Sequence, residues 1–290
     1  MPNQNDNRII PGFTVYHDLS GPTGESYHCH EHHEVIFFLS GEGHYAVEGK
    51  TYHLQPGDLL VISDREIHRD GEKSGKRRDR YIAYIDSAFF EEAKRMDRNG
   101  EDLSRCFEVL SNRRYHLLRL KGQEKKRVAT IFAALAETNS QDYGADMLKK
   151  CYMVELLILL NRACFSEDEP EEALCNPKIQ RIVEFINEHL DEDLNLEFLS
   201  ARFGLSKYHM TREFKRCLGL SLHQYVLKKR LLQAREALRQ GQTAAQAFVL
   251  SGFSDYSHFS RAFRETFGMS PREYRMRVRK GPFPMAEFFW

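Results

Sequence analysis

The stretch that decides the fold is Gly252-Phe-Ser-Asp-Tyr-Ser-His-Phe-Ser-Arg-Ala-Phe-Arg-Glu-Thr-Phe-Gly-Met-Ser-Pro-Arg-Glu-Tyr-Arg275. Its opening pattern, a glycine followed by an apolar residue, serine, a polar residue and tyrosine, also occurs at residues 204–208. The similarity continues downstream, where Phe214, Gly219, Ser221 and Tyr225 correspond to Phe263, Gly268, Ser270 and Tyr274. A turn glycine followed by an amphipathic basic helix, occurring twice, is typical of a paired helix-turn-helix that places two helices in the major groove of DNA. We therefore expect an all-helical C-terminal domain that binds double-stranded DNA.

The periodicity of each repeat predicts which side chains face outward. In the first unit Met210, Phe214 and Leu218 fall four residues apart, so they share one helix face and predict its buried side. In the second unit, the corresponding buried stripe is Phe259, Phe263 and Phe267. The residues on the two opposite faces are the candidate DNA contacts: Lys207, Tyr208, Thr211, Arg212, Lys215, Tyr256, Ser257, Ser260, Arg261 and Arg264.

Two arginines, Arg212 and Arg261, hold equivalent positions on these outer faces. A guanidinium there can bond guanine bidentately or hold a phosphate. The helix expected over residues 222–240 spans roughly 28 Å at 1.5 Å per residue, which allows the two recognition helices to enter successive major grooves about 34 Å apart. Ser206 and Ser254 stand where the N-caps of these helices are expected.

Charge and composition fit a nucleic-acid-binding module joined to a different domain. Residues 177–280 contain 19 Lys and Arg against 11 Asp and Glu, a net +8, whereas the whole chain is neutral and the remainder therefore carries −8. The six cysteines show no paired spacing, which argues against a disulfide framework or a cysteine zinc site. The N-terminus has no apolar signal core, and the best apolar run, residues 153–160, is too short to cross a membrane. We expect a cytoplasmic protein with no membrane contact.

The N-terminal half has a different pattern. From Tyr27 to about Asp86, short alternating segments separated by glycines predict an antiparallel sandwich or small barrel, within residues of about 10–90. Apolar residues at three- and four-residue spacing then predict an antiparallel helix pair, residues 124–137 and 145–164, within a helical region of about 120–165. The expected organisation is a first domain over 1–165, an acidic solvated linker over 166–176, the DNA-binding domain over 177–280 and an apolar tail over 281–290 that docks on the protein or on a partner.

A row of histidines marks the candidate sensor site. His28, His30, His32 and Glu34 alternate, so on a single strand all four leave the same face, which suits a wet pocket or a metal site. A third interpretation is a solvent-facing edge with no ligand.

Residues 252–275 resemble the signature of the AraC/XylS family of bacterial transcription regulators, and the resemblance covers about residues 177–278. It implies sequence-specific promoter binding, transcription activation through contact with RNA polymerase, and a homodimer. The dimer surface would lie on the helix pair over residues 124–164, with Leu156, Leu159 and Leu160 as candidates; the alternative is that the pair forms a purely internal hairpin core. One departure from the family pattern is Ala247-Phe248, where members usually carry Ile-Ala; this moves side-chain bulk by one position in the helix that supports the second unit.

The N-terminal segment, His28-x-His30-(x)3-Glu34 followed by Pro56-Gly57-Asp58 and His68, resembles the cupin barrel, the usual sensor domain of sugar-responsive relatives. The implied fold class is a two-domain α+β protein, with a cupin-like antiparallel β-barrel and helix pair followed by a double helix-turn-helix. The resemblance implies a small-molecule effector, with a sugar favoured. No nucleophile motif, phosphate loop or paired-carboxylate arrangement appears elsewhere in the sequence, so we expect no enzymatic activity and no cofactor. The effector-lining candidates are His30, Glu34, His68, Arg80 and Tyr84.

Two other functions stay open. A metal-binding cupin, either an enzyme or a metal sensor, would use His28, His30, Glu34 and His68 as ligands, as metal-binding cupins do; the second cupin motif departs from the pattern, however, because residues 64–68 lack its proline and glycine. Alternatively, the barrel is inert and the protein binds DNA constitutively, in which case no small molecule changes its promoter affinity.

Overall fold

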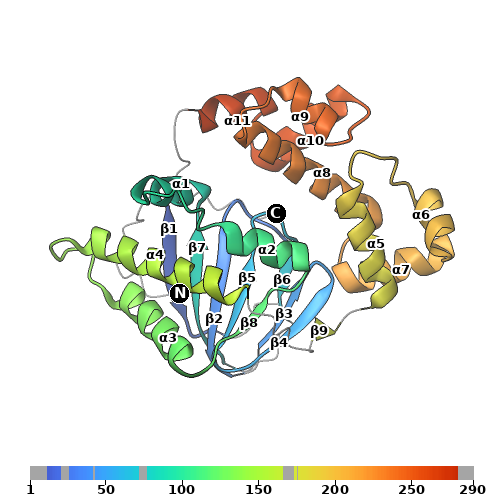
Figure 1. Cartoon of the computed structure of the whole chain (residues 1–290). Coiled ribbons are helices and arrows are strands. Elements are labelled where there is room, and N and C mark those ends of the chain that lie inside the picture. Colours follow the sequence, from blue (N-terminus) through green and yellow to red (C-terminus); the bar gives the residue numbers. More distant parts are fainter. Residues whose placement is uncertain are drawn as a thin grey trace.

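The computed structural model of the chain describes residues 12–20, 26–41, 43–71, 77–165, 173–174 and 176–279. The expected tail 281–290 and most of the expected linker 166–176 lie outside these described residues. Figure 1 shows two parts, a sensor half with the strands and helices α1–α4, and a DNA-binding half made of helices α5–α11.

The sensor half contains two antiparallel sheets. The five-stranded sheet has the order β1 (Phe13–Asp18), β7 (Asp79–Ile85), β2 (His33–Ser40), β5 (Asp58–Ile62), β8 (Leu117–Arg119). The four-stranded sheet has the order β6 (His68–Asp70), β3 (Gly43–Val47), β4 (Lys50–Leu54), β9 (Ala173–Leu174). The predicted antiparallel cupin-like domain is confirmed, but the strands of the described residues form two sheets and not a closed barrel.

Alternation along β2 explains how the layers pack. Val35 and Phe37 face the helices, where the Phe37 ring stacks on Phe132 with centroids 5.6 Å apart. Ile36 and Phe38 face the other sheet and belong to the apolar core between the two sheets. The helices of the outer layer are α1 (Ser87–Met96), α2 (Arg105–Arg113), α3 (Gly122–Glu137) and α4 (Ala145–Ala163). The sensor half therefore has three layers: the helices α1–α4 pack on one face of the five-stranded sheet, and the four-stranded sheet packs on its other face.

The expected helix pair is confirmed as α3 and α4, but the expected dimer surface is wrong in part. Leu156 and Leu160 are both 0% exposed, because they lie on the same face of α4 as Met153 and pack into the core shared with α3 and the five-stranded sheet. Leu159 is partly buried against the same core. Leu156 and Leu160 therefore stabilise the monomer and are not available to a partner.

The linker also differs from the expectation of a fully solvated segment. Ala173 pairs with Tyr52, and Leu174 pairs with Thr51. The edge strand β4 has backbone N–H and C=O groups that a further strand can pair with, so residues 173–174 add a short strand to this sheet although the sequence around them is acidic.

The DNA-binding half consists of two helix-turn-helix units, as predicted. Its helices are α5 (Pro177–Glu188), α6 (Leu196–Phe203), α7 (Lys207–Leu218), α8 (Leu222–Arg239), α9 (Ala244–Leu250), α10 (Tyr256–Phe267) and α11 (Pro271–Val278). The recognition helices α7 and α10 end at Gly219 and Gly268, whose φ angles of 68° and 71° favour glycine. The helix α8 connects the two units (Figure 1).

The N-caps of the recognition helices differ between the two units. The Ser206 hydroxyl accepts from the backbone N–H of His209 at 3.3 Å, as predicted. Ser254 was expected to repeat this role, but the second cap is Asp255, whose carboxylate accepts from the N–H of His258 at 2.5 Å. A carboxylate at the positive end of a helix is a strong cap, so the extra acidic residue takes the position from the serine beside it.

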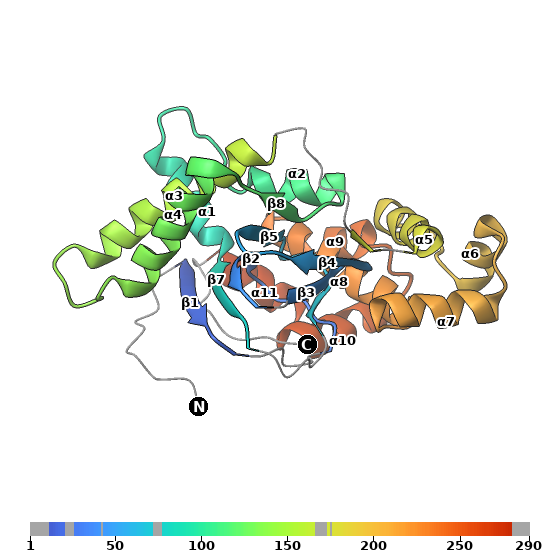
Figure 2. The ribbon, with the colours of Figure 1, turned by 90° about the horizontal axis from the view of Figure 1, so that it is seen from below.

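The two halves are packed together. Tyr27, Ala46 and Ile67 of the sensor half belong to the same apolar core as Met210 and Phe214 of the first helix-turn-helix unit. In the view from below in Figure 2, α8 lies behind β3 and β4, and its Tyr225 and Lys229 bind Glu48 in the turn between these strands. We call this arrangement the docked state.

Candidate functional site

The predicted DNA-contacting side chains lie on the solvent side of α7 and α10. Nine of the ten are exposed, and Ser260 is half-buried. These exposed fractions were obtained for the whole chain with the two halves docked, and Tyr208 is 77% exposed in that state. The predicted inner stripes are buried, with Phe214 and Phe263 both 0% exposed. The docked sensor half therefore leaves the recognition faces open, and their contacts with DNA stay a prediction.

Local contacts position the arginine of the first unit. The guanidinium of Arg212 lies 5.8 Å from the Tyr208 ring centroid, and its Nε lies 3.6 Å from Glu213 Oε1. Glu213 also pairs with Arg216 at 2.8 Å on the following turn. These exposed pairs are weak, so each arginine is free to exchange its carboxylate for a base edge or a phosphate.

The Ala247-Phe248 pair is accommodated by repacking. Ala247 is 0% exposed beneath the second unit, while the Phe248 ring packs edge-on against Tyr256, with centroids 5.4 Å apart, and lies 5.8 Å from Phe259. The bulk missing at position 247 is thus supplied from position 248, on the side nearest the start of α10.

The histidine row does not lie on one strand, which corrects that prediction. Strand β2 begins only at His33, while His28 forms an isolated bridge with His68. His32 lies 4.0 Å from Asp86 and does not join the other histidines on Glu34. The backbone bend at residues 31–32 turns the His32 side chain away from Glu34 and toward Asp86.

Three histidines and a glutamate nevertheless meet between the sheets, and we call them the histidine cluster: His28, His30, His68 and Glu34. The Oε2 atom of Glu34 lies 3.4 Å from His30 Nε2 and 3.2 Å from His68 Nε2. All four residues are at least nine-tenths buried. The structure thus brings together His28, His30, Glu34 and His68, but not His32. It does so through the bend at residues 31–32 and the bridge between His28 and His68.

Burial and charge set the protonation of the cluster. Burial lowers the pKa of His30 to about 4 despite the neighbouring Glu34. For His68 burial acts in the same direction, but hydrogen bonding and the charge of Glu34 outweigh it and raise the pKa. Burial would raise the pKa of Glu34, yet His30 and His68 hold it well below its usual range. At neutral pH Glu34 is therefore ionised and His30 is neutral, while the charge of Glu34 favours the protonated form of His68.

The two remaining effector candidates also face this space, which settles the facing of β7. Tyr81 packs on the helix side, so Arg80 and Tyr84 point between the sheets. The Tyr84 ring lies 5.2 Å from His30, and Arg80 is bound by Asp18 at 2.8 Å and by Asp70 at 3.0 Å. An anionic effector would have to displace these carboxylates, whereas a neutral one would not.

The cluster also has the composition of a metal site. One ligand atom from each of His28, His30 and His68 lies within 4.8 Å of the others. Binding zinc would draw these nitrogens to about 2.0–2.1 Å from the ion, with Glu34 able to add an oxygen. Imidazole and carboxylate ligands together suit zinc, iron, manganese or nickel.

A buried ion-pair group joins the two halves. Asp64 of the sensor half accepts from Arg235 at 2.9 Å and from Arg239 at 2.5 Å, both on α8. Burial would raise the pKa of Asp64, but Arg235, His33 and Arg239 hold it well below its usual range. Arg235 is only 1% exposed, so this pairing is a buried charged contact between α8 and the sensor half.

The tyrosines that recur in the two repeats both contact sensor carboxylates. The hydroxyl of Tyr225 donates to Glu48, to which Lys229 also binds at 3.1 Å. The hydroxyl of Tyr274 donates to Glu31 at 3.3 Å. Each helix-turn-helix unit is thus held by its own tyrosine and its own sensor carboxylate.

Sequence reasoning missed these docking residues. The one available signal was the repeat itself, because Tyr225 and Tyr274 fall on the buried sides of their units, and a buried phenol needs a hydrogen-bond partner. Nothing in the sequence indicated that Glu48 and Glu31 supply it, since those contacts join segments more than 170 residues apart.

Together, the double helix-turn-helix with open recognition faces and the docked sensor half define a DNA-binding transcription regulator with a ligand-binding domain. Comparison with known proteins agrees. Residues 16–144 match the family described as AraC-like ligand binding domain, and residues 199–277 match the family described as helix-turn-helix domain. The two matched regions together identify the chain as a member of the AraC family of transcriptional regulators.

Among similar proteins, the uncharacterized HTH-type transcriptional regulator YbfI of Bacillus subtilis is 26% identical, covering 80% of each chain. The HTH-type transcriptional activator RhaS of Escherichia fergusonii is 25% identical over 86% of each chain, and the probable transcriptional regulator LumQ of Photobacterium leiognathi is 27% identical over 88% of this chain and 94% of its own. Of solved structures, ToxT from Vibrio cholerae is 12% identical over 91% of this chain and 98% of that chain, with a TM-score of 0.35.

No helix in the described part of the chain is long and apolar enough to span a bilayer.

Proposed function

We propose that this regulator is controlled by a small-molecule effector bound at the histidine cluster, and that the effector acts by changing how the sensor half holds the two helix-turn-helix units. The effector site consists of His30, Glu34, His68, Arg80 and Tyr84. The proposal also includes the division of the chain into a sensor domain over 1–165 and a DNA-binding domain over 177–280.

One observation carries this proposal: each histidine of the cluster stands next to a residue that touches the DNA-binding half. Tyr27, beside His28, donates its hydroxyl to the carbonyl of Cys217 at 2.7 Å. Glu31, beside His30, accepts from Tyr274. Ile67, beside His68, packs in the core of the first unit. A ligand that moves the histidines therefore moves the docking contacts.

The recognition faces are open in the docked state, so control by simple occlusion does not fit. The sensor half instead contacts both units, the first through Glu48 and Tyr27 and the second through Glu31. A change in these contacts changes the spacing and angle between α7 and α10, which must match successive major grooves. The effector shifts the equilibrium only as far as its affinities for the two arrangements differ.

A neutral sugar is the effector class that the site favours. Imidazoles, a carboxylate and a tyrosine supply both donors and acceptors for hydroxyl groups, while Arg80 is already neutralised by Asp18 and Asp70. The proposed role is activation in the cytoplasm, as a homodimer that contacts RNA polymerase. The relatives named transcriptional activator RhaS support activation.

A second candidate effector is a divalent transition metal. The observation favouring it is the approach of His28, His30 and His68 ligand atoms to within 4.8 Å, with Glu34 beside them. A metal would replace the contacts of Glu34 with His30 and His68 by coordinate bonds and would move the same neighbouring residues.

A thermal-shift screen of the full chain against neutral sugars, sugar acids and divalent metals tests the proposal, followed by anisotropy measurements of affinity for a DNA site selected from a random library. A ligand of the site raises the unfolding midpoint and changes DNA affinity, and both effects disappear in Glu34→Gln. Glu124→Gln, on the exposed face of α3, is the matched control and should respond like the natural chain. A shift with metals alone would establish the second candidate. If no compound shifts the midpoint, or if DNA affinity never changes, the cupin-like domain does not act as a sensor and the proposal fails.

A further inference from the structure

Two histidines face each other on the outer surface of the four-stranded sheet, and we call them the histidine pair: His44 on β3 and His53 on β4. The register of the two strands places these residues directly opposite each other. Their ring centroids are 4.2 Å apart, and their ring planes are inclined by 73°. Both residues are exposed. Two imidazoles therefore stand together at the surface, in a place that the function proposed above does not use.

The turn between the two strands determines how close these side chains come. Residues 48–49 form a two-residue turn with φ angles of 47° and 81°, and the register runs without interruption from Val47 opposite Lys50. In such a hairpin the pair next to the turn is hydrogen-bonded, and non-hydrogen-bonded pairs then alternate with hydrogen-bonded ones. His44 and His53 form the fourth pair from the turn, which is a non-hydrogen-bonded one. Opposite side chains come closest in pairs of this kind, whose Cα atoms are about 4.5 Å apart.

The neighbouring strand leaves room beside His44. Strand β6 pairs Asp70 with Tyr45, so its continuation brings Gly71 next to His44. A Cβ atom on Gly71 would lie 3.0 Å from the Cβ atom of His44 and 2.5 Å from its carbonyl oxygen. Glycine at this position thus avoids a side chain that would crowd His44 from that side.

The histidine pair and the histidine cluster lie on opposite faces of the four-stranded sheet. Tyr45 and Tyr52 face the five-stranded sheet and belong to the core between the two sheets. The Tyr45 ring lies 6.4 Å from that of His68, a member of the cluster. Because successive side chains of a strand point to opposite faces, His44 and His53 point away from the cluster.

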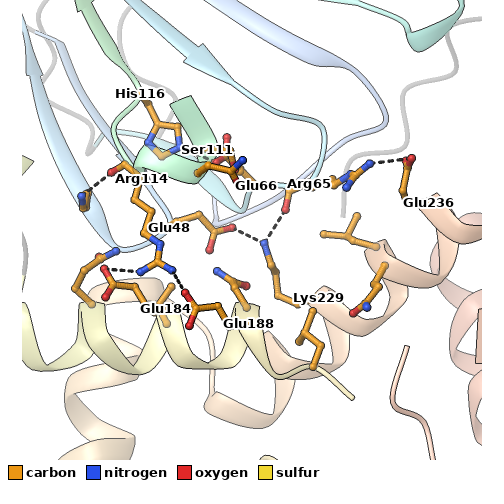
Figure 3. Close-up of a pocket in the computed structure, with 18 of the residues that line it drawn as sticks. Glu48, Arg65, Glu66, Ser111, Arg114, His116, Glu184, Glu188, Lys229 and Glu236 are labelled. Atoms are coloured by element: carbon orange, nitrogen blue, oxygen red, sulfur yellow. Dashed lines mark hydrogen bonds and ion pairs between the residues drawn. The ribbon is translucent and has the colours of Figure 1, made fainter. Parts of the chain in front are cut away.

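The DNA-binding half holds the other end of the same hairpin. Ala46, two residues from His44 on the same face, packs in the core that contains Phe214. Glu48, in the turn, lies 3.1 Å from Lys229 of α8 (Figure 3). The docked contacts therefore fix the turn end of the hairpin, and the histidine pair lies toward its open end.

Two imidazoles on facing strands have the chemistry of a chelating metal site. Imidazole suits zinc, copper and nickel, and the affinity of a given site rises from nickel to copper and falls again at zinc. The nitrogens must come to about 2 Å from the ion, which rotation of the two rings about their side-chain torsions can achieve from a centroid separation of 4.2 Å. The sheet holds both backbones in place, so little conformational entropy is lost when the second imidazole binds.

We propose that the histidine pair is a surface site for a divalent late transition-metal ion, to which His44 and His53 each supply one nitrogen, with Cu²⁺ bound more tightly than Ni²⁺ or Zn²⁺. The bound ion links β3 to β4 at the open end of the hairpin. The inference goes beyond the proposed function, because neither ligand belongs to the effector site or to the metal ligands of the second candidate effector.

Electron paramagnetic resonance of the full chain with the Cu²⁺–iminodiacetate complex tests the inference. Iminodiacetate fills part of the coordination shell of the ion and leaves room for two imidazoles, and its bulk keeps the complex out of the histidine cluster, whose members are at least nine-tenths buried. Binding with the spectroscopic signature of two imidazole nitrogens is expected.

Single substitutions assign the two nitrogens. His44→Ala and His53→Ala should each weaken binding by roughly tenfold or more, because the second nitrogen is then no longer held beside the first. Both positions are exposed, so neither substitution disturbs the core. His223→Ala removes an exposed histidine of α8 and is the matched control; this variant and Glu34→Gln should bind the complex like the natural chain.

The contrary outcomes are distinct. The signature of a single imidazole nitrogen, or binding that both His44→Ala and His53→Ala retain, overturns the histidine pair as a metal site. Binding that disappears in Glu34→Gln and persists in the two pair variants assigns the metal to the histidine cluster instead. Absence of binding to the natural chain also overturns the inference.

Discussion

Replacing Asp64 with asparagine should release the DNA-binding half from the sensor half. The carboxylate of Asp64 is 3% exposed and accepts from Arg235 at 2.9 Å and from Arg239 at 2.5 Å. Asparagine keeps the size of the side chain but removes its charge, so Arg235, which is 1% exposed, stays buried in the docked state without the carboxylate that pairs with it, and Arg239 loses one of its two nearby carboxylates.

The magnitude follows from that burial. Removing one partner of a buried ion pair costs about 3–5 kcal/mol, because the remaining charge is desolvated and uncompensated. Undocking returns Arg235 and Arg239 to water, so the substitution cannot destabilise the chain by more than the free energy of docking. A cost of about 3 kcal/mol shifts the docking equilibrium roughly 100-fold toward the open state.

Hydrogen–deuterium exchange followed by mass spectrometry measures this directly. In Asp64→Asn, exchange should accelerate by about two orders of magnitude in residues 26–33 and along the sensor-facing side of α8, while strands β2 and β5 keep their protection. Glu236→Gln is the matched control on the same interface. It breaks the pair with Arg65, whose side chain is 51% exposed, and should cost less than about 1 kcal/mol. Equal protection in Asp64→Asn and in the natural chain would refute the assignment of Asp64 to docking.

Three further changes test other parts of the structure. Phe263→Ala, at a side chain 0% exposed, should cost the second unit about 3–5 kcal/mol in urea unfolding, and an unchanged midpoint would show that the core is placed incorrectly. Tyr274→Phe removes the hydroxyl that donates to Glu31 at 3.3 Å and should raise exchange in residues 26–33 about fivefold, the effect of about 1 kcal/mol; no change would remove this contact from the docking. Burial lowers the pKa of His33 although Asp64 opposes it, so below pH 6.5 the unfolded chain binds a proton that the folded chain does not. Stability from His33 is therefore complete above pH 6.5 and decreases as the pH falls, and His33→Leu should flatten that slope of urea-unfolding free energy; an unchanged slope would show that other groups cause it.

The helical half could be predicted in detail because its information is local. A period of 3.6 residues places Met210, Phe214 and Leu218 on one face, and the structure buries all three. The error at Ser254 arose between two adjacent residues that can both cap a helix, and only the backbone geometry decided for Asp255.

The sensor site was harder to predict because its geometry depends on irregular backbone. Alternation correctly put His28, His30 and Glu34 together, but through a bend and a bridge to His68 and not along one strand. His32 follows the same alternation and still points to Asp86. The docking contacts are long-range pairs of charges, such as Asp64 with Arg235, and no period in the sequence encodes them.

The central claim, that α7 and α10 read DNA as one unit, is tested most directly by the affinity of the full chain for a site selected from a random library, compared with random DNA, in Arg212→Ala and Arg261→Ala. We predict that each variant loses about 1–3 kcal/mol, roughly 5- to 150-fold, on the selected site and much less on random DNA. An equal loss on both DNAs would make the arginines phosphate contacts, and unchanged affinity for the selected site in both variants would contradict the assignment of these helix faces to DNA reading.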